Sequence, residues 1–241
     1  MKKLLVSILV VFVGYCFVVN ENFRNSTIEE VNNVKEKIEK SIGSGNSPNK
    51  KDEFDFEDSS YGYSEESKRY FKEICYGSEF GDKTKTLYKW KKDMKIYVSG
   101  EKRDYLISEL NNIVYELNTI IDPIDIEIVT NKYEANYVIY FCSASEYGNA
   151  EPGVRHLLDK NWGLFTVSGS NGEFQNGTMY VDIYRCQSTS AQKHVLREEL
   201  TQSLGMANDS YKYKNSIFYQ GWTETNSYAP IDIDVIEILY N

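Results

Sequence analysis

Residues 101–121 carry an apolar stripe at helical spacing, and this stripe is the strongest constraint that the sequence places on the fold. Its members recur every three or four residues, as side chains on one face of an α-helix do. Asp122 and Pro123 end the stripe, because proline disfavours helical backbone at the residue before it. We therefore expect one long helix that packs through seven apolar side chains: Leu106, Leu110, Ile113, Val114, Leu117, Ile120 and Ile121.

Segments with the composition of β-strands surround this helix. Residues 94–98 precede it, and residues 124–130 alternate apolar and polar side chains as a half-buried strand does. Residues 137–142 are nearly all apolar or aromatic, which is typical of a strand buried on both faces. Residues 164–168 and 178–184 are two further strand candidates, and the connection between them is rich in turn residues.

Two more helices complete the expected order. One is predicted from about residue 190 to 204, and a short one follows Pro230 over residues 231–240. Residues 143–161 contain glycine and proline and are expected to form a long loop. Strands and helices in this order predict a mixed α/β (α+β) domain.

The N-terminal 20 residues have the pattern of a targeting segment. Lys2 and Lys3 precede an apolar run over residues 4–19, as in a secretory signal peptide or an uncleaved membrane anchor. In either case the rest of the chain lies outside the cytoplasm, secreted or anchored, and this segment is its only expected contact with the membrane. Residues 21–66 hold 12 acidic and 6 basic residues and are expected to form a charged, partly helical tether, with a helix at 26–42. The domain then spans residues 67–241, with its core at about 94–241.

Composition excludes several classes of function. The net charge is -9, from 27 Lys plus Arg against 36 Asp plus Glu, which argues against a nucleic-acid-binding face. The chain has 2 His, so it cannot supply a zinc site with three histidines. Beyond residue 20 the cysteines are Cys75, Cys142 and Cys186, which allow at most one disulfide and do not indicate which pair would form it. The oligomeric state stays open.

The helix at 190–204 concentrates the polar groups that could do chemistry. At 100° per residue, His194, Glu198, Gln202 and Gly205 cluster on one side, whereas four apolar side chains fall broadly on the other. Glu199 lies between the two sides. One interpretation is an exposed polar face with local hydrogen bonds, and the other is a helix that lines a cleft.

Residues 198–208 read E-E-x-x-Q-x-x-G-x-x-N, which resembles the H-E-x-x-H-x-x-G-x-x-H motif of the metzincin zinc proteases. The register matches at Glu199 and Gly205, while Glu198, Gln202 and Asn208 stand at the three histidine positions. Residues 134–141 and 230–240 also resemble metzincin segments. Residues 198–210 (EELTQSLGMANDS) are similar, more closely, to a bacterial family of unknown function that carries E-E-L-T-Q-x-L-G-x-x-N-D-S.

The resemblance implies a zincin-like fold with a mixed, mostly parallel sheet, an N-terminal amphipathic helix, an active-site-type helix and a short C-terminal helix. It also implies a peptide hydrolase in which Glu199 is the general base. Zinc or another divalent metal would be held by Glu198, Gln202 and either Asn208 or Asp209, with His194, Glu198 and Asp209 as a second possible set.

The departures from the metzincin motif weaken the inference of catalysis and leave an alternative function open. A glutamine side chain is a poor zinc ligand, and no methionine follows Met206 to form the turn that lies beneath the metzincin metal. The alternative is a pseudoenzyme without a metal, which binds an extracellular peptide or a cell-envelope component and does not cut it. A third interpretation is a structural module in which the polar row supports the loop after Gly205.

Overall fold

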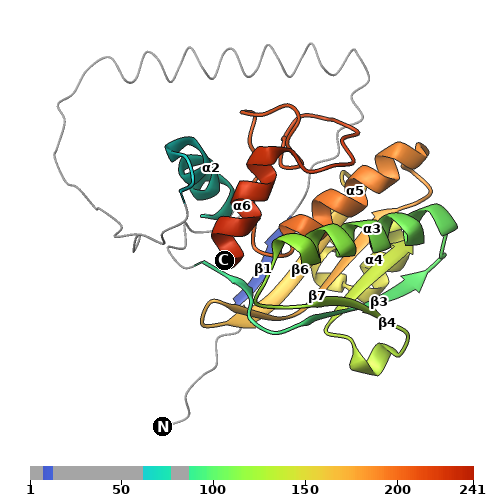
Figure 1. Ribbon diagram of the computed structural model, residues 1–241. Helices are drawn as coiled ribbons and strands as arrows, with labels where there is room; N and C mark the ends of the chain where they lie inside the picture. The colour runs from blue at the N-terminus through green and yellow to red at the C-terminus, as the bar shows by residue number, and fades with distance from the viewer. Residues whose placement is uncertain (1–7, 13–61, 77–86) are drawn as a thin grey trace, which may run out of the picture. The chain divides into compact units, whose positions relative to one another are not determined.

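The computed structural model describes residues 8–12, 62–76 and 87–241 (Figure 1). The helix expected at residues 26–42 and nearly all of the tether lie outside these residues. No helix in the described part of the chain has the length and apolar character needed to cross a membrane.

Within the described residues, seven strands form one sheet. Its main path has the order β1-β6-β7-β5-β3-β4, and β2 pairs with the start of β7. β4, β3, β5 and β7 run parallel, β6 is antiparallel to β7, and β1 is antiparallel to β6. This mostly parallel sheet confirms the mixed α/β fold class. The strands are β1 Ile8–Phe12, β2 Lys89–Trp90, β3 Met94–Gly100, β4 Ile126–Val129, β5 Tyr137–Cys142, β6 Gly163–Ser170 and β7 Glu173–Asp182.

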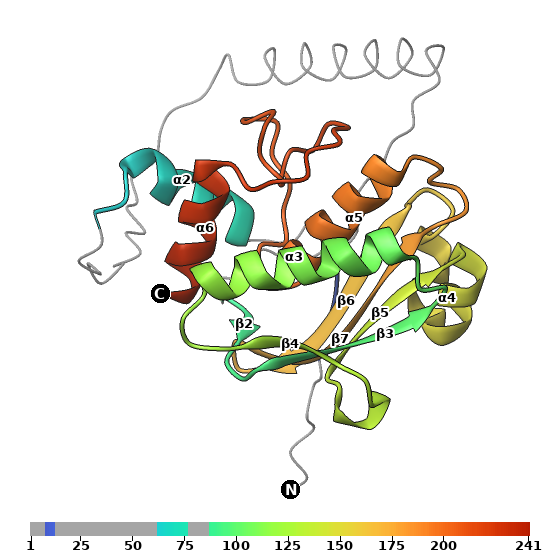
Figure 2. The same ribbon diagram turned by 45° about the vertical axis from the view of Figure 1, so that its right-hand side comes forward.

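Helices cover both faces of this sheet (Figures 1 and 2). The helices expected near 101–121 and 190–204 are α3 and α5, which pack against each other on one face. A shorter helix and a 3-10 turn lie on the opposite face, and the last helix packs beside the first described helix. Their bounds are α2 Glu65–Cys75, α3 Asp104–Ile120, η1 Lys132–Glu134, α4 Ala144–Ala150, η2 Pro152–Leu157, α5 Thr189–Gln202 and α6 Pro230–Tyr240.

Alternation along the strands divides the core into two layers. Phe165 on β6 and Val181 on β7 belong to the large apolar cluster that also contains the inner faces of α3 and α5. Their neighbours Leu164 and Tyr180 belong to a smaller cluster with Tyr147 of α4. Because successive side chains of a strand point to opposite faces, the central strands are buried on both sides.

Residues 143–161 were expected to form a long loop, and this expectation is wrong. They contain α4 and η2. Ser143 begins α4 with a capping box, in which its hydroxyl accepts from the Glu146 amide and the Glu146 carboxylate accepts from the Ser143 amide. The S-x-x-E pattern is a sequence signal for such a helix start, and Pro152 occupies the first turn of η2.

The connection between β6 and β7 is also shorter than the sequence predicts. β6 extends to Ser170 and β7 begins at Glu173, so two residues form the turn. Asn171 and Gly172 both have positive φ, 56° and 73°. A two-residue Asn-Gly turn of this kind matches the twist of a tight hairpin.

An ion-pair cluster joins α3 to α5. Arg197 is buried, and its guanidinium donates to Glu109 at 2.9 Å and to Glu116, both on α3. The guanidinium carbon lies 4.8 Å from the ring centroid of Tyr228. Sequence analysis did not single out Arg197, because the charge pattern of α5 alone does not show which side chains α3 places opposite it.

Replacing Arg197 with methionine should destabilise the fold. The substitution removes the buried guanidinium that pairs with both Glu109 and Glu116, and breaking a buried ion pair typically costs about 3 kcal/mol or more in the free energy of unfolding. Lys193→Met is the matched control, since Lys193 is partly exposed and its Nζ lies 3.5 Å from the same Glu109 carboxylate; it should cost less than about 1 kcal/mol. Urea unfolding measures both, and equal losses in the two variants would contradict this account of the interface.

Candidate functional site

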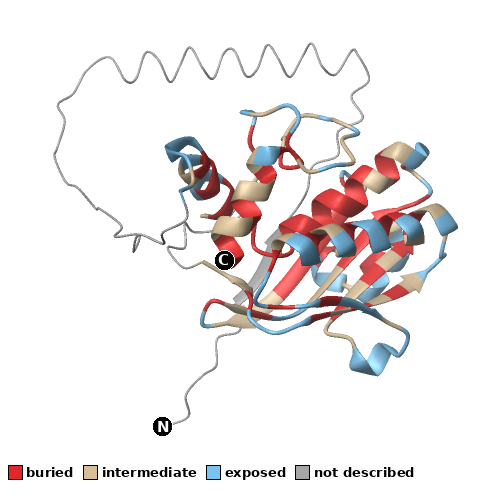
Figure 3. Ribbon diagram, viewed as in Figure 1, coloured by how far each residue is buried: buried red, intermediate tan, exposed pale blue. Residues whose placement is uncertain are grey.

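The helix α5 is buried around almost its whole circumference (Figure 3). Ser188 caps its N-terminus by accepting from the Ala191 amide. The exposed fractions of Glu198, Glu199 and Gln202 are 5%, 1% and 3%. The interpretation of this row as an exposed polar face is therefore wrong. Buried polar groups need hydrogen-bond partners, so their partners define what the row can do.

Gly163 lets α5 approach the sheet closely. A Cβ atom at this position of β6 would lie 2.4 Å from Val195 Cγ1 and 2.7 Å from Glu199 Oε1. Real Cβ atoms essentially never approach other atoms so closely. The absent side chain therefore makes room for the Glu199 carboxyl group, which is held against β6 rather than in open solvent.

His194 is held in one orientation by the loop that precedes α6. Its Nδ1 lies 2.6 Å from the carbonyl oxygen of Thr225, and because a carbonyl only accepts, Nδ1 carries the proton. In the neutral ring Nε2 is then an acceptor, and it lies 3.5 Å from Glu198 Oε2, one helical turn away. Burial lowers the pKa of His194, so the neutral form is favoured.

The surroundings of Glu198 favour its neutral carboxylic acid form. Burial raises its pKa well above the ordinary value, and the nearby Asp209 and Glu199 carboxyl groups raise it further. A protonated Glu198 faces the acceptor Nε2 of His194. Both pKa shifts therefore favour a neutral pair, with the acid on Glu198 and the base on His194.

Gln202 and Asn208 have different partners. Gln202 Nε2 donates to Asp209 Oδ1 at 2.5 Å. The Asn208 amide instead donates to three carbonyl oxygens at the end of α2, those of Glu73, Ile74 and Tyr76. The structure thus brings together His194 with Glu198, and Gln202 with Asp209, whereas Asn208 fastens α2.

The arrangement of these side chains does not fit a zinc centre. Zinc ligands converge on one point, but the Gln202 amide is directed at Asp209 and the Asn208 amide at the end of α2. In the part of the chain that the structure describes, no three His, Cys, Asp or Glu side chains lie together as a metal site. Metal binding by the candidate residues stays a prediction from the motif.

Two tryptophans border the polar row. Trp222 packs edge-on to His194, with ring centroids 6.0 Å apart, and Trp162 packs edge-on to Trp222 at 5.6 Å. Trp162 immediately precedes β6, and Trp222 is 38% exposed. Trp162 packs against the main core, while Trp222 presents part of its ring to solvent.

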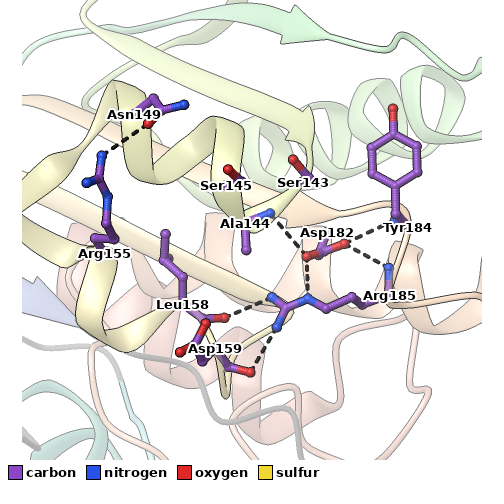
Figure 4. A pocket seen from close by; sticks show the side chains of 10 residues that line it. All are labelled: Ser143, Ala144, Ser145, Asn149, Arg155, Leu158, Asp159, Asp182, Tyr184 and Arg185. Carbon is purple, nitrogen blue, oxygen red and sulfur yellow. Dashed lines mark hydrogen bonds and ion pairs between the residues drawn. The ribbon is translucent and has the colours of Figure 1, made fainter.

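A second candidate site is a cleft of about 600 Å³ at the carboxyl ends of β5 and β7 (Figure 4). The buried Asp182 carboxylate accepts from the Ala144, Tyr184 and Arg185 amides and from Arg185 Nε at 2.6 Å. Arg185 also donates to the carbonyl oxygens of Leu158 and Asp159. Asp182 and Arg185 thus hold together the loops that border the cleft. The sequence analysis did not identify this cleft. The expected strands contained one indication of it, because ligands of open α/β sheets bind outside the carboxyl ends of the strands.

The three cysteines of the domain are buried thiols without a disulfide: Cys75, Cys142 and Cys186. Burial raises the pKa of Cys142 and of Cys186 to about 12, and raises that of Cys75 as well. Their thiolates are therefore disfavoured at neutral pH, and none is a nucleophile of the ordinary reactive kind.

The chain is similar to one protein family and to solved structures. A family profile described as "Protein of unknown function (DUF2927)" matches residues 64–241. No curated protein matches the chain. Among solved structures, the chain is similar to one described as "Crystal structure of myroilysin", with 10% identity, 70% of this chain and 92% of that chain covered, and a TM-score of 0.40. A second, "Structure of Myroilysin", aligns at 12% identity over 58% of this chain and 57% of that chain, with a TM-score of 0.31.

Gly163→Ala should destabilise the protein because the added methyl group meets Val195 and Glu199 on α5. Overpacking of this kind costs about 1–3 kcal/mol in the free energy of unfolding. Gly153→Ala is the matched control, since a Cβ at that position meets nothing within 4 Å. Thermal or urea unfolding compares the two, and an unchanged stability in Gly163→Ala would contradict the close packing of α5 on β6.

Glu198 and His194 should give opposite pH dependences of stability. Above a pH of about 4.5 the unfolded chain releases the Glu198 proton while the folded chain keeps it, so this residue makes stability fall as pH rises. Below a pH of about 6.5 the unfolded chain protonates His194 while the folded ring stays neutral, so this residue makes stability fall as pH falls. Each contribution is limited to about 1.4 kcal/mol per pH unit.

Urea unfolding of Glu198→Gln and His194→Gln between about pH 5 and pH 8 separates the two contributions. Relative to the parent chain, Glu198→Gln should gain stability progressively as pH rises, and His194→Gln should gain it as pH falls. A stability profile parallel to that of the parent in both variants would show that neither group has a shifted pKa.

Proposed function

We propose that this chain, which belongs to the DUF2927 family of proteins of unknown function, is an extracytoplasmic peptide-binding domain on a zincin-like scaffold. In this proposal the polar side chains of α5 that resemble the metzincin motif stabilise the fold and do not bind a substrate. Recognition takes place on the edge of the sheet instead. The pairing of β1 with β6 is the observation that carries the proposal.

β6 receives a five-residue antiparallel strand along its outer edge. The register runs from Ile8 opposite Gly169 to Phe12 opposite Phe165. Without β1, the amide and carbonyl groups along this side of β6 would lack strand partners, because β7 occupies only its other side. Such an edge is suited to bind an extended peptide by strand addition.

The sequence predicts a different role for the segment that forms β1. Residues 8–12 lie within the apolar run expected to be a signal peptide or a membrane anchor. Five residues cannot pair with β6 and lie in a bilayer at the same time. We therefore regard β1 as an exchangeable strand, whose place an extracellular peptide, or the peptide part of a cell-envelope component, takes.

The contacts of α5 favour binding without cleavage. As a hydrolase, the domain would need Glu199 to activate a water molecule. Glu199 is instead packed against Gly163, burial raises the pKa of Glu198 and favours its neutral form, and Gln202 donates to Asp209. These contacts support a network that stabilises the helix, and they favour the pseudoenzyme over the active hydrolase.

Releasing β1 should increase peptide binding. In the full chain, Val10→Pro together with Val11→Pro removes the amide donor to β6 at whichever of the two residues faces it, because the amides of an edge strand alternate in direction, and the proline rings disfavour pairing. The probe is a fluorescent peptide that contains the sequence ILVVF. It should bind the double variant about tenfold or more tightly than the parent chain, where the chain's own strand competes at high effective concentration. Fluorescence anisotropy measures both affinities.

Glu199→Gln in the same double variant is the control for catalysis. Binding should be retained and the peptide should stay intact in both chains, as mass spectrometry of the incubated peptide would show. Equal affinity of the parent and double-proline chains would contradict the edge as the binding site. Cleavage that disappears in Glu199→Gln would establish the hydrolase instead.

A further inference from the structure

We infer that the peptide bound along β6 carries a hydrogen-bond donor, such as the hydroxyl of threonine or serine, at the position opposite Thr166. The Thr166 hydroxyl oxygen accepts from this donor. The inference rests on the proposed function and specifies the class of peptide that the edge takes. Its basis is the register of β1 on β6, the alternation of side chains along β6 and the direction of the hydrogen bonds around Thr166.

Thr166 faces the side of the sheet that α4 covers. Its neighbours on β6, Phe165 and Val167, belong to the large apolar cluster on the other side, with α3 and α5. Leu164, two residues before Thr166, belongs to the smaller cluster with α4. Because side chains alternate along a strand, Thr166 lies on the α4 face with Leu164. A residue of a bound strand directly opposite Thr166 has its side chain on the same face.

The register fixes which peptide residue reaches Thr166. Thr166 pairs with Thr178 of β7 on one side and with Val11 of β1 on the edge side. A peptide ILVVF that takes the place of β1 in the same register therefore brings its fourth residue to Thr166. Valine has no side-chain group that donates a hydrogen bond. A peptide with a donor at this position would thus make a contact that the chain's own strand does not offer.

A row of hydroxyl groups crosses the α4 face and ends at Thr166. Thr178 Oγ1 lies 3.0 Å from Thr166 Oγ1 and 2.9 Å from the Tyr147 hydroxyl. It also donates to Glu151 Oε1 at 3.2 Å. Each hydroxyl has one proton to donate, and an ionised carboxylate only accepts. Because the Thr178 proton goes to Glu151, Thr178 accepts from both Tyr147 and Thr166.

This direction determines what Thr166 can offer to a bound peptide. Its single proton is used on Thr178, so its oxygen presents only lone pairs to the edge. A donor on the peptide pairs with such an oxygen, whereas a carboxylate cannot. Thr166 is 7% exposed with β1 in place, so a wrong partner leaves polar groups unpaired away from water. The Glu151 carboxylate at the other end of the row disfavours an anion further.

Peptides of matched shape test the inference in the full-length Val10→Pro/Val11→Pro chain. ILVTF places threonine opposite Thr166 and should bind about two- to fivefold more tightly than ILVVF, as expected for a cross-strand pair of hydroxyl residues. ILTVF is the matched control, because its threonine lies opposite Val167 on the apolar face, and it should bind no more tightly than ILVVF. ILVNF should bind more tightly than ILVDF, whose carboxylate has a similar shape and no proton to donate. Fluorescence anisotropy measures each affinity.

Variants of the chain locate the preference. Thr166→Val removes the acceptor and should abolish the advantage of ILVTF over ILVVF, whereas Thr166→Ser keeps the hydroxyl and should keep the advantage. Ser168→Ala is the matched control, because Ser168 is two residues further along β6, on the same face and opposite Leu9. It should leave the advantage unchanged. The peptide comparisons need no change at Thr166 and test the inference even if Thr166→Val perturbs the fold.

The outcomes separate this inference from the proposed function. Equal affinities of ILVTF and ILVVF, or binding of ILVDF as tight as that of ILVNF, would overturn the inference of a donor and leave strand addition standing. An advantage of ILVTF that survives Thr166→Val, or that is lost in Ser168→Ala, would overturn the assigned position. Failure of every peptide to bind would overturn the proposed function as well.

Discussion

The burial of a polar helix against a glycine of the sheet is the constraint on which the rest of this structure depends. Because α5 lies directly on β6 at Gly163, its polar side chains have little access to water. Each then needs a protein partner, since an unsatisfied buried polar group costs about 1–3 kcal/mol. The loop before α6 supplies Thr225 to His194, and α3 supplies Glu109 to Arg197. The helix thereby ties distant parts of the chain together.

The same burial distinguishes the side chains that stabilise the fold from the groups that could bind a peptide. Of the side chains that the motif presents as metal-binding, His194 lies beside Glu198, Gln202 donates to Asp209 and Asn208 donates to the end of α2. In the cleft beside Asp182, the ion pair of Asp182 with Arg185 holds the loops together. The edge of β6 differs, because what it presents is backbone, and its partner β1 comes from a segment that the sequence predicts to act elsewhere. We place binding on that edge for this reason.

The sequence predicted the elements with long or strong periodicity and missed those specified by short caps and turns. The stripe at 101–121 and the apolar run at 137–142 match α3 and β5, because burial on a face or on both faces leaves a clear pattern. Residues 143–161 were expected to be a loop, although the capping box at Ser143 specified a short helix. For the site, helical spacing correctly made His194 a neighbour of Glu198. It could not show that Thr225 and Trp222, from a distant loop, cover that face and bury it.

The most direct test of the account is to map the bound peptide by nuclear magnetic resonance on the isotopically labelled full chain. The account predicts that the largest shifts on adding the ILVVF peptide fall on the backbone amides of β6. Shifts centred on Ser145, Tyr184 and their neighbours in the cleft, with β6 unchanged, would contradict the claim that this domain binds peptides by strand addition.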